Sequence, residues 1–271
     1  MARTLQPLSL GKILDETFEI YRHNFVLFIG ISAIPNLVLL LLKIGAIGFG
    51  IDMSTDTLVG ALIGLGTWFA SLFAEAIVTA ATTFAVSDIY LDTPTTIARC
   101  FSLVSGKALK VTYVSFILAL TIGIGFLLCI VPGIWWAGVY GIAIPAVVLE
   151  NIRGRDALSR SASLTKNSVG RIIVIYFLTA IFSGIMVIAL SVSVGTLRLA
   201  IFQTPQGSRL LKEITATLGA ILFGPISAIA LTLAYYDQRV RNEAFDIEHM
   251  MSLMGVQESL PSVPAPPPMA E

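Results

Sequence analysis

Histidine and cysteine are scarce in this sequence. The 271 residues include two of each. Neither His23 nor His249 has a second histidine or a cysteine at the spacing of a metal site. Cys100 adjoins a polar loop and Cys129 lies in an apolar run, so we predict neither a disulfide nor a redox pair. The sequence therefore gives no reason to assign a metal or a cofactor.

Charge is also scarce. Charged residues make up 13% of the chain and hydrophobic residues 56%, whereas a soluble domain carries about 25% charged residues. The mean hydropathy is +0.86, so too little polar surface exists for a fold in water. The formal net charge of +0 removes the usual electrostatic case for nucleic-acid binding, which relies on a concentrated basic surface. We predict an integral membrane protein with no nucleic-acid partner.

Six apolar runs are long enough to cross a membrane, which takes about 20 helical residues for about 30 Å of hydrocarbon. The predicted fold class is thus all-α, a polytopic transmembrane helical bundle. The predicted spans are residues 25–47, 58–86, 109–131, 134–149, 172–194 and 214–236. Val131, Pro132 and Gly133 separate the third run from the fourth, which favours a tight turn there.

Basic residues indicate the orientation of the spans. Of the 17 basic residues, all but Lys43, Arg198, Arg209 and Lys212 fall on one side of the predicted membrane. Because lysine and arginine concentrate in cytoplasmic loops, we expect both termini in the cytoplasm. Residues 1–248 are predicted to form one membrane domain, and the proline-rich residues 249–271 a flexible cytoplasmic tail.

An amphipathic pattern precedes the first, third and fifth spans, and each copy predicts an interfacial helix on the cytoplasmic side. The three copies can be aligned, which predicts three hairpins of two spans, each preceded by a surface helix. Chance likeness between amphipathic segments is the alternative. The alignment matches four sets of three positions, of which the first is Leu14, Ile97 and Leu158 and the last is Phe25, Ala108 and Val169.

Each predicted hairpin ends at an acidic residue, namely Asp88, Glu150 or Asp237. A carboxylate at a helix C-terminus is electrostatically unfavourable, so we expect each to have a basic neighbour. The expected arrangement is a cytoplasmic ring of ion pairs that links surface helices to span ends. The candidate partners are Arg22, Arg153, Arg155 and Arg239.

Glu75 lies well inside the second predicted span, roughly 20 Å before Asp88 along a helix. Ionisable residues at such a depth usually face the bundle interior or a wet cavity. One interpretation is proton coupling or capture of a polar headgroup. The other is a protonated side chain that hydrogen-bonds a neighbour such as Thr79 or Thr67.

Three prolines interrupt predicted spans: Pro35, Pro145 and Pro225. Proline frees a backbone carbonyl and bends a helix, and discontinuous helices form the substrate sites of many transporters. Prolines are also common in spans that merely curve. Both interpretations stay open at these positions.

Three segments together resemble a known family: LQPLSLGKILDETFEIYRHNF from Leu5, ALSRSASLTKNSVGRI from Ala157 and AIALTLAYYDQRVRNEAFDIE from Ala228. They are similar to the bacterial glycerophosphoryl diester phosphodiesterase membrane-domain family, over roughly residues 5–248. The resemblance implies a protein of the bacterial inner membrane that is connected with lipids. It does not imply phosphodiesterase activity, because the histidine-containing catalytic barrel of that family has no counterpart in this sequence.

The sequence shows no pattern typical of an active site: no nucleophile with its base, no paired carboxylates and no metal cluster. We therefore predict no enzymatic activity. The leading hypothesis is a non-catalytic membrane module that binds lipid or a protein partner and has an organising or regulatory role. The alternative is a small transporter or lipid-moving protein that uses Glu75 and the proline-interrupted spans. A transporter predicts a hydrated cavity that reaches Glu75, whereas a scaffold predicts a closed bundle around it.

Overall fold

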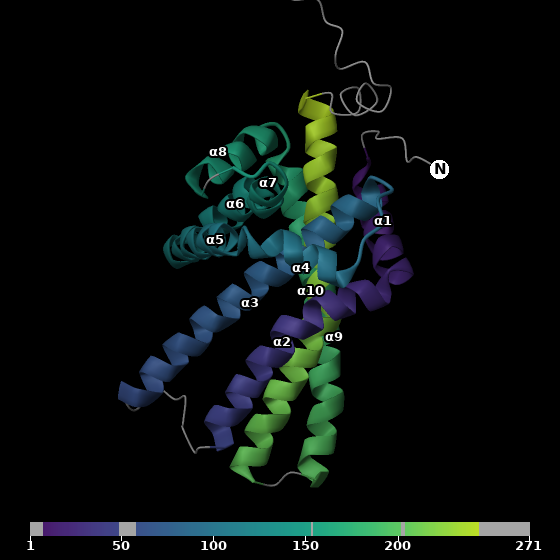
Figure 1. Ribbon diagram of the computed structural model, residues 1–271. Coiled ribbons are helices and arrows are strands. Elements are labelled where there is room, and N and C mark those ends of the chain that lie inside the picture. Colours follow the sequence, from purple (N-terminus) through teal and green to yellow (C-terminus); the bar gives the residue numbers. More distant parts are fainter. Residues whose placement is uncertain (1–7, 49–57, 153, 202–203, 244–271) are drawn as a thin grey trace, which may run out of the picture.

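A computed structural model describes residues 8–48, 58–152, 154–201 and 204–243 of the chain. Within these ranges the chain forms ten α-helices and no strand (Figure 1). The predicted tail of residues 249–271 lies outside them. The helices are α1 (Leu10–His23), α2 (Phe25–Gly48), α3 (Leu58–Tyr90), α4 (Ile97–Ser105), α5 (Ala108–Leu128), α6 (Ile130–Tyr140), α7 (Ala143–Leu149), α8 (Gly154–Thr165), α9 (Val169–Ile201) and α10 (Pro205–Glu243).

Six helical segments are long and apolar enough to cross a membrane: Phe25–Gly48, Leu58–Tyr90, Ala108–Leu128, Ile130–Leu149, Val169–Gly195 and Gly207–Glu243. Large apolar side chains such as Leu41 and Leu127 are exposed on these segments, as expected where lipid rather than water surrounds a helix. The chain is accordingly an all-helical multi-pass membrane protein.

The helix α10 is central to the molecule, because α1, α2, α3, α7, α8 and α9 all pack against it. In Figure 1, α2, α9 and α10 run alongside one another, while α3 diverges from them. Leu8 and the last turn of α10 lie together, and we call this end, which also holds α8, the terminal end. The opposite end is where α9 ends and α10 begins.

A short helix precedes each of α2, α5 and α9. The three long helices begin at Phe25, Ala108 and Val169, which are the positions that the sequence alignment matches. Two of the short helices have a capping residue at their start. Ser9 caps α1 and Thr96 caps α4, because each side chain accepts a hydrogen bond from a backbone N–H group of the first turn.

The turn between the third and fourth spans lies at Cys129 rather than at residues 131–133. Helix α5 ends at Leu128 and α6 begins at Ile130, and Cys129 between them has extended backbone angles. Pro132 falls in the first turn of α6, where its missing N–H costs nothing. The sequence "VPG" therefore starts a helix here instead of separating two.

The fourth span is broken between α6 and α7, at Gly141 and Ile142. A break exposes carbonyls that need donors in apolar surroundings. The hydroxyls of Ser161 and Thr165 on α8 both donate to the carbonyl of Val139, at 2.8 and 3.1 Å. Helix α8 thus satisfies the backbone that the break leaves without a partner.

Helices α5 and α6 approach one another closely through glycine. A Cβ atom added at Gly125 would lie 2.8 Å from the Cα atom of Gly133 and 3.0 Å from its backbone nitrogen. Backbone atoms cannot move aside as a flexible side chain can, so any larger residue at position 125 pushes the two helices apart.

We expect Gly125→Ala to destabilise the protein by about 1–3 kcal/mol, the usual cost of overpacking. Gly123→Ala on the same helix is the matched control, because a Cβ there meets no atom within 4 Å and alanine has the better helix propensity. Thermal unfolding in detergent, followed by circular dichroism, measures both. Equal melting temperatures for the two variants would contradict the close approach of α5 and α6.

Candidate functional site

A cavity of about 550 Å³ opens among α2, α3, α5, α7 and α10. Its walls are mostly apolar, with leucine and alanine side chains from four of the five helices. Polar side chains are set among them at intervals: Asn36, Lys43, Ser71, Glu75, Thr79, Ser115 and Thr217. We call this space the Glu75 cavity.

Glu75 lies in the middle of α3, and its side chain is exposed in the cavity. Its chain neighbours Ala74 and Ala76 are buried, so the carboxyl group projects from a packed part of the helix. Among the described residues it has no hydrogen-bond or ion-pair partner. The hydroxyl of Thr67, one of the two expected partners, donates instead to the carbonyl of Gly64 at 2.9 Å.

None of the other described polar side chains that line the cavity forms an ion pair or hydrogen bond with Glu75. Lys43 forms an ion pair with Glu213 at 2.9 Å, which joins α2 to α10 toward the opposite end. The hydroxyl of Ser115 is buried and has no partner among the described residues. Since buried polar groups cost free energy when they lack a hydrogen bond, a ligand with both donors and acceptors would satisfy Glu75 and Ser115.

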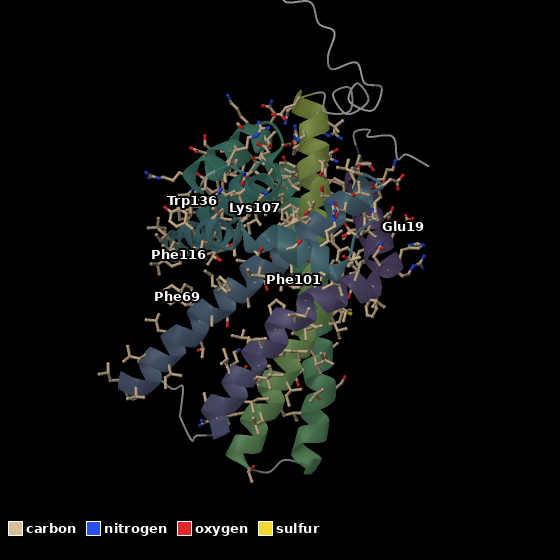
Figure 2. The ribbon with its side chains drawn as sticks, viewed as in Figure 1. Glu19, Phe69, Phe101, Lys107, Phe116 and Trp136 are labelled. Carbon is tan, nitrogen blue, oxygen red and sulfur yellow. The ribbon has the colours of Figure 1, made fainter. Side chains whose placement is uncertain are left out.

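Aromatic rings form one side of the cavity region, between α3 and α5. The rings of Phe69 and Phe116, labelled in Figure 2, lie 5.9 Å apart between centroids. Trp68 packs against Phe116 at 6.5 Å and also lines the cavity. The ring cluster keeps α3 and α5 in contact where α3 diverges from α2.

Pro35 and Pro225 lie inside continuous helices, α2 and α10. Around Pro225, hydroxyl groups of three other helices donate to carbonyls of the preceding turn. Ser32 donates to Ala220 at 3.3 Å and Ser183 to Phe223 at 3.4 Å, and Tyr21 donates to Leu222. The carbonyl that Pro225 leaves without its helical donor is that of Ile221, four residues before it, so these bonds attach α10 to three neighbouring helices on either side of that position.

Pro145 differs from the other two prolines, because it lies in the first turn of α7, directly after the break at Gly141 and Ile142. It is the one of the three at which a described helix is discontinuous. All three prolines are near residues that line the cavity, since Pro35 directly precedes Asn36, Pro145 directly follows Ile144 and Pro225 lies five residues after Ala220.

Acidic residues near the terminal end each have arginine partners. Asp88, near the end of α3, pairs with Arg99 of α4 at 3.0 Å. Glu150, just after α7, pairs with Arg160 of α8 at 2.8 Å. Each pair links the end of one span to the next short helix along the chain, and the cation offsets an acid at a helix C-terminus.

Asp237 near the end of α10 is buried, with its side chain 0% exposed. It accepts a hydrogen bond from the backbone N–H of Leu8 at 2.8 Å. Its carboxylate also pairs with Arg171 at 3.3 Å and Arg241 at 3.0 Å. Two arginines and an N–H group thus compensate a charge that would otherwise be costly to bury.

The ion pairs of the described residues join these acids to other arginines than the four that we expected from the sequence. Arg239 pairs with Glu243 at 3.1 Å. Arg153 lies outside the described residues, and neither Arg22 nor Arg155 forms an ion pair with a described residue. The pairs recorded for the acids use Arg99, Arg160, Arg171 and Arg241.

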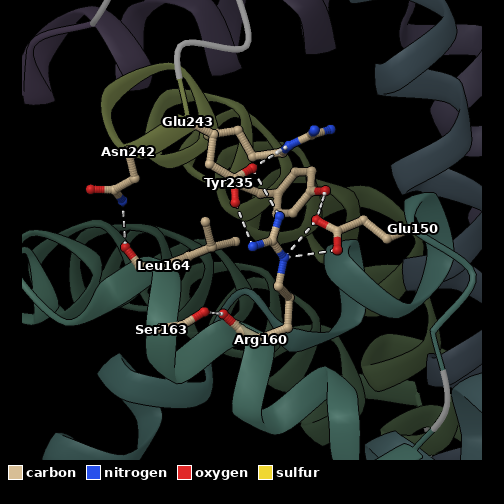
Figure 3. Close-up of polar contacts among 8 residues, drawn as sticks. Glu150, Arg160, Ser163, Leu164, Tyr235, Asn242 and Glu243 are labelled. Atoms are coloured by element: carbon tan, nitrogen blue, oxygen red, sulfur yellow. Dashed lines mark hydrogen bonds and ion pairs between the residues drawn. The ribbon is translucent and has the colours of Figure 1, made fainter. Parts of the chain in front are cut away.

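Arg160 is the centre of a larger network, shown in Figure 3. Its Nε donates to both carboxylate oxygens of Glu150, at 3.0 and 2.8 Å, and its Nη2 donates to Glu243 at 2.8 Å. The hydroxyl of Tyr235 also donates to Glu150, at 2.7 Å. The hydrogen bonds to Glu243 and to Glu150 raise the pKa of the Arg160 guanidinium above its usual range, because they stabilise its charged form.

Among the described residues, no three histidine, cysteine, aspartate or glutamate side chains lie together where they could hold a metal ion. Comparison with family models, with curated proteins and with solved structures finds no match to this chain. The candidate site therefore stands on its geometry alone.

We expect Arg160→Met to destabilise the protein by about 1–3 kcal/mol, because hydrogen bonds to charged groups contribute about that much and Glu150 and Glu243 each lose one arginine partner. Arg155→Met on the same helix is the matched control, and should stay within about 0.5 kcal/mol of the original. Thermal unfolding in detergent measures both. A loss at Arg155 as large as that at Arg160 would contradict the role of the network.

Proposed function

We propose that this chain is a non-catalytic membrane module that holds an amphiphilic lipid with its headgroup in the Glu75 cavity. The observation that carries the proposal is an exposed carboxyl group, without a partner among the described residues, in a cavity between apolar spans. An ionisable group at such a depth is expensive. A bound headgroup that donates hydrogen bonds to Glu75 would offset that cost.

The shape of the surroundings supports an amphiphile rather than a small polar solute. A second hollow of about 290 Å³ lies between α2 and α3 and has an almost wholly apolar lining, including Val38, Leu42 and Phe73. Leu39 lines both this hollow and the Glu75 cavity. A headgroup in the cavity would thus have apolar surface close by for its chain.

The same proposal includes an arrangement in the membrane. We infer three hairpins, each introduced by a surface helix, α1, α4 or α8, with the terminal end in the cytoplasm. The excess of basic residues on that side supports the orientation, and the starts of α2, α5 and α9 at matched positions support the repeat. Location in a bacterial inner membrane and membership of the phosphodiesterase membrane-domain family rest on the sequence resemblance alone.

Glu75→Gln tests the lipid site, since it replaces the carboxyl group with an amide and keeps the size of the side chain. We expect the lipid that copurifies with the protein in polymer-extracted native discs to fall roughly tenfold, as the loss of a hydrogen bond of about 1.5 kcal/mol implies. Mass spectrometry of the extracted lipids measures this.

Leu62→Gln is the matched control, because it adds the same amide to α3 at an exposed position away from the cavity. It should leave the retained lipid unchanged. The proposal would be contradicted if the lipids that copurify with the original protein and with both variants had the composition of the bulk membrane.

A second candidate function is transport or movement of lipid between the two leaflets. Pro35 and Pro225 favour it, because they place bendable turns of α2 and α10 beside the cavity. The proposed route passes Glu75, which then exchanges a proton or a headgroup contact during each passage.

We expect the purified protein in liposomes to speed the transfer of an aminophospholipid labelled on its acyl chain with a fluorophore that dithionite quenches. Glu75→Gln should slow this transfer roughly tenfold, while Leu62→Gln should not. A transfer rate no higher than that of protein-free liposomes would exclude this second function and leave the lipid-binding proposal untouched.

A further inference from the structure

A third hollow, distinct from the Glu75 cavity and from the apolar hollow between α2 and α3, lies at the terminal end. It measures about 950 Å³ and opens between α6, the start of α9 and the last turns of α10. The residues that matter to its chemistry are Trp135, Lys166, Gly170, Arg171, Gln238 and Arg241. We call it the basic pocket, and it shares no residue with the Glu75 cavity.

Positive charge dominates the lining of this pocket. Lys166, Arg171 and Arg241 all line it, and no acidic residue of the described ranges does. Asp237 lies behind the two arginines and compensates part of their charge. Lys166 is exposed and forms no ion pair with a described residue, so the pocket keeps an excess of positive charge.

Backbone donors add to the charge. Helix α9 starts at the pocket, and the N–H groups of Arg171 and Ile172 both donate to the carbonyl of Ser168. The N–H groups of Val169 and Gly170 have no acceptor among the described residues. Free N–H groups in the first turn of a long helix attract anions, because they carry the positive end of its dipole.

The space beside these donors is open. A Cβ atom added at Gly170 would meet nothing within 4 Å, so a ligand can approach the backbone there. Trp135 lines the same pocket with an exposed ring, and Val169 and Val240 supply apolar surface. Cationic groups, backbone donors and apolar surface thus meet in one hollow where spans end.

We propose that the basic pocket binds a phosphate group, the chemistry that an anionic phospholipid headgroup and a soluble phosphate share. Lys166 and the two arginines supply charge from different directions, which suits an anion with several oxygens better than a single carboxylate. The free N–H groups of Val169 and Gly170 complete the donors. Basic pockets between spans are known to hold such headgroups.

Two variants test the pocket without disturbing the arginines that hold Asp237. Lys166→Glu reverses an exposed charge and should weaken phosphate binding roughly 25-fold, at about fivefold for each unit of charge. Gly170→Asp places an acid among the backbone donors and should weaken binding at least fivefold. The aspartate favours the start of a helix, so the melting temperature should stay equal or rise.

Lys12→Glu is the matched control, because Lys12 is an exposed lysine on α1 that does not line the pocket. It should leave the affinity unchanged. The full chain is purified in dodecyl maltoside, which contains no phosphate, and isothermal titration calorimetry measures two probes, dihexanoyl phosphatidic acid and inorganic phosphate.

The two probes distinguish the sources of the phosphate. Tighter binding of phosphatidic acid, by tenfold or more, assigns the pocket to a lipid headgroup, and equal binding of the two probes assigns it to a soluble phosphate. No binding of either probe at millimolar concentration overturns the proposal. So does an equal loss of affinity in Lys12→Glu and Lys166→Glu, since it would show attraction by overall charge.

Discussion

Backbone N–H and C=O groups need partners wherever water is absent, and this requirement governs the fold more than any single contact. A continuous helix meets the requirement by itself, which is why the described chain is almost entirely helical. Where a helix is broken or bent, other helices supply the missing donors. Ser161 and Thr165 do so at the break before α7, and Ser32 and Tyr21 add hydrogen bonds to carbonyls near Pro225. The short helices α1 and α8 are therefore part of the backbone hydrogen bonding of the spans.

Ion pairs give the terminal end a recurring pattern. Arg99 and Arg160 each lie two residues after the aligned positions Ile97 and Leu158, and each pairs with the acid that ends the preceding span. The residue at the corresponding place after Leu14 is Glu16, which cannot balance Asp237. Asp237 instead pairs with Arg171 and Arg241 and accepts a hydrogen bond from the N–H group of Leu8. A departure at one position thus explains why the third acid is buried among different partners.

The number of apolar helices could be predicted from the sequence, because hydrophobicity and length are local properties. The starts of α2, α5 and α9 follow from the end of a polar face, which is local too. The partners of Asp88, Glu150 and Asp237 were not predicted, because only packing decides which arginine reaches each acid; Arg171 and Leu8, which also bind Asp237, are distant from it in the sequence. The same holds for Glu75. The sequence predicts that Glu75 lies deep in a span. The cavity beside Glu75 could not be predicted, because it forms where α3 diverges from α2 while α10 and α5 stay near. The turn at Cys129 shows a third limit, since a proline pattern alone does not say whether it ends one helix or begins the next.

The hydrogen bond between Leu8 and Asp237 joins residues 229 positions apart, and this separation sets an order of assembly. During synthesis, at about 5–20 residues per second, Leu8 waits on the order of tens of seconds before its acceptor has been made. Arg171 and Arg241, which both donate to the carbonyl of Leu8, are also made long after it. Leu8 is therefore translated long before its partners and is among the last residues to reach its final place. A fragment that ends before Arg171 contains α1 but none of the three residues that bind the backbone of Leu8.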